Sequence, residues 1–109
     1  MYLDDLGDLI AFRELNITGE GKLDKAIKVM VGKPLPFPDS GGYYCPFQIV
    51  GVGGEEIKYA AGVDSIQALQ LVMVMIGATL QYLNSESGNR LCWEGSSGGD
   101  LGFPAAKHA

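Results

Sequence analysis

Residues 62–84, GVDSIQALQLVMVMIGATLQYLN, contain one charged side chain, Asp64, which stands near their start. Asp64 can cap a helix N-terminus, and Gln67 lies three residues later, where a capping box places Glu or Gln. The polar run NSESGN at 84–89 then interrupts the apolar pattern. This stretch therefore predicts one helix over 65–84.

Placed at about 100° per residue, the glutamines of this helix (Gln67, Gln70 and Gln81) fall on one side. The apolar and aromatic side chains span the remaining arc: Ile66, Leu69, Leu71, Val72, Met73, Met75, Ile76, Leu80, Tyr82 and Leu83. That arc is roughly 220° wide, about twice an ordinary core stripe. Because one sheet covers about half of it, we expect the rest to contact residues 90–104, a second copy or another protein.

Four upstream segments have strand patterns: 9–17, 25–33, 43–52 and 55–63. TGEGK at 18–22 and the glycine pair at 53–54 predict hairpin turns, and the proline-rich residues 33–42 predict an extended loop. Alternation predicts apolar faces made by Ile27, Val29 and Val31, by Cys45, Phe47 and Ile49, and by Ile57, Tyr59, Ala61 and Val63.

The sequence thus predicts an α+β fold in a single domain over residues 1–109. A four-stranded antiparallel meander packs on one long helix in the C-terminal half, because an apolar sheet face must be covered. A short strand and a wrapping tail follow, in which Leu91, Trp93, Leu101 and Phe103 fold back over one flank of the helix.

Charge and composition indicate which classes of partner and which cellular location to expect. The formal net charge is −5, with scattered basic residues, which argues against nucleic-acid binding. Residues 66–83 contain three glutamines and a threonine, so we expect no membrane span. The N-terminus lacks the pattern of a signal peptide, which favours a cytoplasmic protein whose Cys45 and Cys92 are reduced and buried.

Few residues suit catalysis. The only histidine is His108, so histidine-dependent triads and most zinc sites are not expected. The glycine-rich GVGGEE at 51–56 and GSSGGDLG at 95–102 lack a complete phosphate-binding pattern. We therefore expect no catalytic, metal-binding or cofactor-binding residues, no cofactor and no enzymatic activity.

The leading interpretation is a non-enzymatic protein-binding module, with an immunity protein that neutralises a toxin as its specific form. Acidic residues and aromatic anchors are the candidate partner-binding residues: Asp4, Asp5, Asp8, Glu55, Glu56, Tyr43, Tyr44, Trp93, Asp100 and Phe103. One alternative is a small-molecule binder or enzyme with a helix–sheet pocket lined by Cys45, Tyr59, Asp64, Trp93 and Asp100. The other is a structural homodimer joined through the helix at 65–84.

Several motifs also resemble a family of small, uncharacterised bacterial proteins. They are CPFQIVGVG at 45–53, AGVDSIQALQLVMVMIG at 61–77, LCWEG at 91–95 and DLGFP at 100–104. The resemblance covers the second half of the chain well and the first 40 residues loosely. It implies a bacterial cytoplasmic setting and a tail that is part of the fold, and it supplies no catalytic residues.

Overall fold

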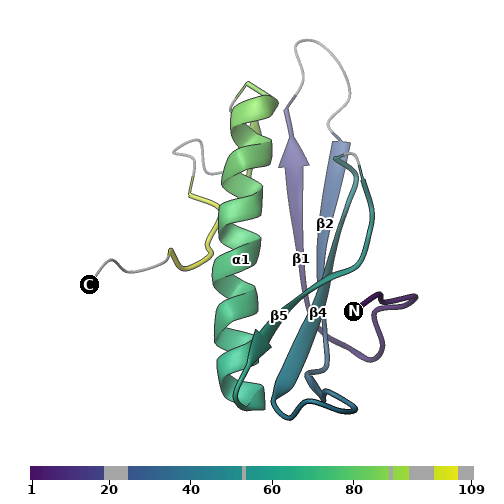
Figure 1. Ribbon diagram of the computed structural model, residues 1–109. Helices are drawn as coiled ribbons and strands as arrows, with labels where there is room; N and C mark the ends of the chain where they lie inside the picture. Colours follow the sequence, from purple (N-terminus) through teal and green to yellow (C-terminus); the bar gives the residue numbers. More distant parts are fainter. Residues whose placement is uncertain (19–24, 53, 89, 94–99, 106–109) are drawn as a thin grey trace.

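A sheet and one long helix make up the fold (Figure 1). The computed structural model describes residues 1–18, 25–52, 54–88, 90–93 and 100–105. The helix is α1 (Ser65–Glu86), and the strands are β1 (Leu9–Ile17), β2 (Lys25–Gly32), β3 (Leu35–Pro36), β4 (Tyr43–Val50), β5 (Lys58–Gly62) and β6 (Leu91–Cys92). The predicted α+β class is confirmed.

The strands form one antiparallel sheet in the order β3-β4-β2-β1-β6, and β5 also pairs with β4. Because β1, β2, β4 and β5 pair in succession, the predicted meander is confirmed. The short β6 extends the opposite edge by pairing with Asn16 and Ile17 of β1. Within the expected proline-rich loop, β3 pairs with the start of β4, at a sheet edge where proline is tolerated.

The connections differ more from expectation than the strands do. The turn predicted at 18–22 falls largely in 19–24, which lies outside the described residues. The two-residue hairpin at 53–54 is wrong, because β4 ends at Val50 and β5 begins only at Lys58. Gly51 adopts a φ of +112° there, which turns the chain out of the ladder.

The core lies between α1 and one face of the sheet. It consists of Leu15, Ile27, Val29, Val31, Cys45, Phe47, Ile49 and Ala60 from the sheet, Ala68, Val72, Ile76 and Leu80 from α1, and Leu91 and Leu101 from the C-terminal segments. The faces predicted for β2 and β4 are therefore confirmed.

In β5 the predicted faces are reversed, because Ala60 is buried beneath the helix while Tyr59 and Ala61 lie on the other side. The reason is the close approach of α1. A Cβ added to Gly62 would collide with the backbone nitrogen of Ala68. Only small residues fit where strand and helix meet, so the helix-facing side of β5 carries little hydrophobic signal.

Polar side chains fix both ends of α1. The Asp64 carboxylate accepts a hydrogen bond from the Gln67 backbone N–H at 2.8 Å, and the Gln67 side chain accepts one from the Val63 N–H at 2.7 Å. This reciprocal cap confirms the predicted helix start. At the other end the buried Asn84 accepts a hydrogen bond from the Leu91 N–H at 2.9 Å, which attaches β6 to the helix.

The C-terminal segment covers only one flank of α1. Leu101 is buried, and a Cβ added to Gly77 would lie 3.0 Å from the Phe103 Cβ, so the tail passes over the helix at Gly77. The opposite flank, at Leu71, Met75 and Tyr82, stays exposed among the described residues. The tail folds over one flank of α1, as predicted, but it leaves the flank of Leu71, Met75 and Tyr82 uncovered.

Replacing Gly62 with alanine should destabilise the fold by about 2–3 kcal/mol, because the added methyl group must push α1 away from β5. The matched control is Gly54→Ala, where an added Cβ has nothing within 4 Å, and the expected change is below about 0.5 kcal/mol. Urea unfolding of both variants measures the difference. Equal stabilities would contradict the close packing of α1 on β5.

Candidate functional site

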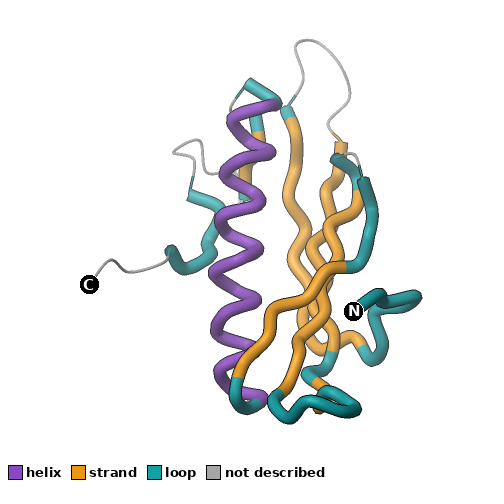
Figure 2. The backbone as a smooth tube through the Cα atoms, in the orientation of Figure 1, coloured by secondary structure: helices purple, strands orange, loops and turns teal. Residues whose placement is uncertain are grey.

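The face of the sheet turned away from α1, which we call the open face, has no helix over it among the described residues (Figure 2). Cross-strand register places Phe12, Met30 and Gln48 in one row on this face, with Glu14 opposite Lys28 beside it. Phe12 is 52% exposed in the middle of β1. The sheet therefore presents a large apolar side chain to solvent on β1.

Aromatic rings gather on the open face beside this row. The ring centroids of Phe37 and Tyr44 are 5.2 Å apart, and Tyr59 meets both rings edge-on at 6.0 and 5.9 Å. Such pairs each stabilise by about 0.5–1.5 kcal/mol beyond their buried area. The cluster thus forms a preorganised aromatic surface at the β3–β4–β5 edge.

Two irregular segments that carry carboxylates contact the open face through their backbone. In the N-terminal segment the Leu6 carbonyl lies over Gly32, and the terminal amine lies 3.5 Å from the Tyr59 hydroxyl. In the connection after β4, the Glu55 carbonyl accepts a hydrogen bond from the Gln48 side chain at 2.6 Å. These segments carry exposed carboxylates, which we call the acidic rim: Asp4, Asp5, Asp8, Glu55 and Glu56. Of these, Glu56 lines a hollow with Phe47 and Tyr82 on the helix side of the sheet.

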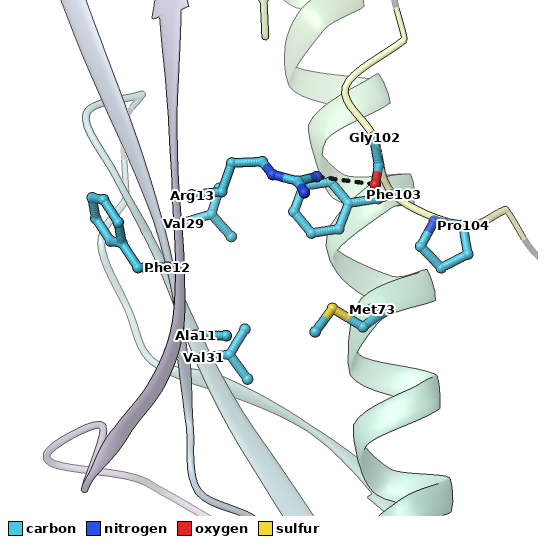
Figure 3. Close-up of a pocket in the computed structure, with 9 residues that line it drawn as sticks. All are labelled: Ala11, Phe12, Arg13, Val29, Val31, Met73, Gly102, Phe103 and Pro104. Atoms are coloured by element: carbon cyan, nitrogen blue, oxygen red, sulfur yellow. Dashed lines mark hydrogen bonds between the residues drawn. The ribbon is translucent and has the colours of Figure 1, made fainter. Parts of the chain in front are cut away.

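On the helix side, Arg13 of β1 holds the tail (Figure 3). Its guanidinium carbon lies 4.0 Å from the centre of the Trp93 ring and 4.7 Å from that of Phe103. The same group donates hydrogen bonds to the Leu101 and Gly102 carbonyls at 3.1 and 3.0 Å. Cation–π contacts and charge-assisted hydrogen bonds together fasten the tail to β1.

The DLGFP motif forms the turn that makes this contact possible. The Asp100 carboxylate accepts a hydrogen bond from the Gly102 N–H at 2.8 Å. Gly102 has a φ of +80°, and a Cβ there would lie 2.6 Å from the Arg13 guanidinium. Only glycine suits both the backbone conformation and the space, so the motif is explained by tail docking.

A cavity of about 120 Å³ remains between the tail, Met73 of α1 and the β1–β2 part of the sheet. In Figure 3 the Phe12 side chain points away from this cavity, toward the open face, whereas Arg13 reaches across it to Phe103. The cavity is smaller than the roughly 300–1,000 Å³ of a small-molecule site. It marks incomplete packing under the tail.

The candidate partner-binding residues divide between the two sides of the sheet. Tyr44 lies on the open side, whereas Glu56 of the acidic rim lines a hollow with Tyr82 on the helix side. Tyr43, Trp93 and Phe103 pack against the core, and Asp100 serves the tail turn. The structure therefore does not bring all of them together on one surface, because the aromatic residues of the tail are used within the fold.

The alternative helix–sheet pocket is not formed by its predicted residues. Cys45 is fully buried beneath α1, Tyr59 lies on the open face, and Asp64 caps the far end of the helix from Trp93 and Asp100. Burial also raises the pKa of the Cys45 thiol from 9.0 to about 11, which disfavours a nucleophilic thiolate.

Both cysteines are free, as expected. Cys92, however, is only half-buried, because β6 is a two-residue edge strand. Its thiol donates a hydrogen bond to the Asn16 carbonyl at 3.5 Å.

Sequence reasoning missed Arg13, Phe37 and Asn84. For Arg13 there was a signal, since a charged residue interrupts the apolar positions Ala11 and Leu15 on the core side of β1. Phe37 gave no such signal, because it lies in a proline-rich segment without hydrophobic periodicity. Asn84 was interpreted as part of the polar run that ends the helix, so its structural role was missed.

Comparison with known protein families identifies the chain. A model of a domain of unknown function, DUF6968, matches residues 11–105, and the chain belongs to this family. The match includes β1 from Ala11 onward, the other strands, α1 and the docked tail. No curated protein and no solved structure matches the chain.

Replacing Arg13 with lysine should release the tail, because an ammonium group loses the planar stacking and the paired hydrogen bonds of the guanidinium. We expect a stability loss of about 1–2 kcal/mol and a red shift in the emission of Trp93, the only tryptophan. Arg90→Lys is the control, since the Arg90 side chain donates its hydrogen bond to the nearby Ser87 carbonyl and to no described residue of the tail. An unchanged emission spectrum in the Arg13 variant would show that the tail is held by other contacts.

Proposed function

We propose that the protein is a non-enzymatic protein-binding module and that the open face is its binding surface. The observation that carries the proposal is the exposure of Phe12 on β1, which stands next to Met30 of β2 on a face that no described helix covers. Aromatic side chains on rigid strands are typical anchors of protein interfaces.

The acidic rim indicates the chemistry of the partner. Exposed carboxylates beside apolar side chains are typical of the polar rim and apolar core of specific interfaces. Lys28 contributes the opposite sign on the open face, but the chain as a whole carries −5. We therefore expect a partner with a basic surface, attracted over a distance by charge and held by contacts to Phe12 and Tyr44.

The specific form of this proposal is an immunity protein that occludes a toxin in the cytoplasm of a bacterium. Small size and acidic charge support it by analogy. The small-molecule alternative gains no support, because its residues lie apart. Nothing in the site geometry favours a catalytic reaction, and we propose no enzymatic activity.

Capture from the native cell tests the proposal with matched serine variants. Phe12→Ser removes the exposed aromatic side chain of β1 from the open face, and Ile66→Ser removes an even more exposed apolar side chain from α1. We expect wild type and the Ile66 variant to retain the same protein partner, and the Phe12 variant to bind about 30-fold more weakly. Thermal melts of all three chains serve to exclude unfolding.

A second variant tests the charge of the partner. Replacing Asp4, Asp5 and Asp8 with asparagine should slow association and reduce its dependence on salt, with little change in dissociation. If the Phe12 variant captured the partner as well as wild type, or if no partner were retained by any chain, the open face would not be the binding surface.

A further inference from the structure

β1 forms an edge of the sheet along most of its length. One side of β1 pairs with β2 from Leu9 to Ile17, whereas the other side pairs with β6 at Asn16 and Ile17. Among the described residues, no strand pairs with this second side between Leu9 and Leu15. We call this stretch the β1 edge. Its N–H and C=O groups are a template for pairing with another extended chain.

The approach of the chain to β6 shows which backbone groups point to the β1 edge. The Thr18 N–H donates a hydrogen bond to the Arg90 carbonyl, just before β6, at 3.0 Å. In an antiparallel strand the N–H and C=O of one residue point to the same side, and this side alternates along the strand. The register of β1 with β2 is regular from Ala11 onward. Glu14 and Phe12, which stand four and six residues before Thr18, therefore direct their N–H and C=O groups to the β1 edge.

The β1 edge carries little protection against pairing. Native edge strands are commonly blocked by proline, by lysine or by a bulge. Residues 9–15, LIAFREL, contain neither proline nor lysine, and the register shift of β1 lies at its start, before Ala11. Leu9, Ile10 and Phe12 are all exposed. An apolar edge of this kind is where an extended chain can add to the sheet.

The cavity under the tail lies beside the β1 edge. Phe12 lines this cavity although its side chain points away, so its backbone forms part of the wall (Figure 3). Val29, Val31 and Met73 supply apolar walls. Arg13 is the one charged residue among those that line it, and its guanidinium binds the tail carbonyls. A volume of about 120 Å³ suits one aliphatic side chain, since an engineered cavity of about 150 Å³ accepts benzene.

A strand paired with the β1 edge would meet both features at once. Successive side chains of a strand point to opposite faces of the sheet. One set would lie beside Phe12 on the open face, and the other would lie beside Ala11 and Arg13, toward the cavity. In complexes formed by strand addition, main-chain hydrogen bonds provide affinity and pockets for alternate side chains provide specificity.

We propose that the β1 edge binds an extended segment of the partner protein as an added strand, with one aliphatic side chain of that segment in the cavity under the tail. This proposal rests on the protein-binding role proposed above and specifies how the partner docks. The added strand continues the line of β6, which already pairs with this side of β1. A second copy of β1 matches the site poorly. Its helix-side residues Ala11, Arg13 and Leu15 are small, charged and buried in their own core, respectively.

Amide hydrogen exchange of the full chain, followed by nuclear magnetic resonance, tests whether the edge is open. The N–H groups of Phe12 and Glu14 should exchange at least about 100-fold faster than those of Arg13 and Leu15, which point to β2. Equal protection of the two pairs would show that the chain itself covers the edge, and would overturn the proposal.

Decapeptides selected on the full chain from a random library displayed on phage serve as the binding probe. We expect alternating apolar patterns, and a shift in the emission of Trp93, whose ring lies against Arg13 at the cavity. N-methylation of one alternate set of peptide amides should weaken binding at least about 30-fold, because the hydrogen bonds to β1 are lost, and that of the other set less than about threefold. A selection without binders, or equal effects of the two sets, would overturn strand addition.

Two variants with matched controls locate the site. Glu14→Pro removes an N–H from the β1 edge, where proline is tolerated, and Glu14→Thr keeps it. Ala11→Leu fills the cavity, and Ala61→Leu adds the same bulk at an exposed position of β5. We expect Glu14→Pro and Ala11→Leu to weaken peptide binding at least about tenfold, and both controls to bind as wild type does, with thermal melts to exclude unfolding.

Capture of the native partner separates this proposal from the proposed function. If Glu14→Pro retained the partner as well as wild type while Phe12→Ser lost it, the open face would remain the binding surface and strand addition would be overturned. Loss of the partner from both variants, with retention by Glu14→Thr, is the result we expect.

Discussion

One helix is too narrow to cover this sheet. An α-helix with its side chains is about 10–12 Å wide, whereas strands lie about 4.8 Å apart, so a sheet five strands across spans roughly 20 Å. The backbone of α1 is drawn close to β5 at Gly62, and the helix packs on β4 and β5. The β1 side of the same face must be covered by other residues.

The C-terminal tail supplies this cover, and its features follow from the need to hold an irregular segment in place. A strand could dock by a hydrogen-bond ladder, but β6 contributes only two paired residues. Arg13 holds the tail instead, because its guanidinium binds tail carbonyls and the Trp93 ring at the same time. Gly102 has no Cβ, and a Cβ at this position would clash with the guanidinium. A charged residue on the core side of β1 is thus compensated by the tail that it holds.

Much of the fold could be predicted from the sequence because the signals were local. Ile27, Val29 and Val31 alternate cleanly, and Asp64 and Gln67 define the helix start by direct hydrogen bonds. The faces of β5 could not be predicted, because Ala60 is buried by the proximity of α1 and not by its own hydrophobicity. For the site, the acidic rim was visible as exposed carboxylates, but the role of Trp93 depended on Arg13, eighty residues away in the chain.

Nuclear magnetic resonance with a soluble paramagnetic agent tests most directly the claim that the sheet is sealed on one face and open on the other. The Phe12 ring and the Met30 methyl should broaden strongly as the agent is added. The methyl groups of Ile27, Val72 and Ile76, which are buried between sheet and helix, should stay sharp. Equal protection of both sets would show that the open face is covered, and would contradict this account of the fold and its binding surface.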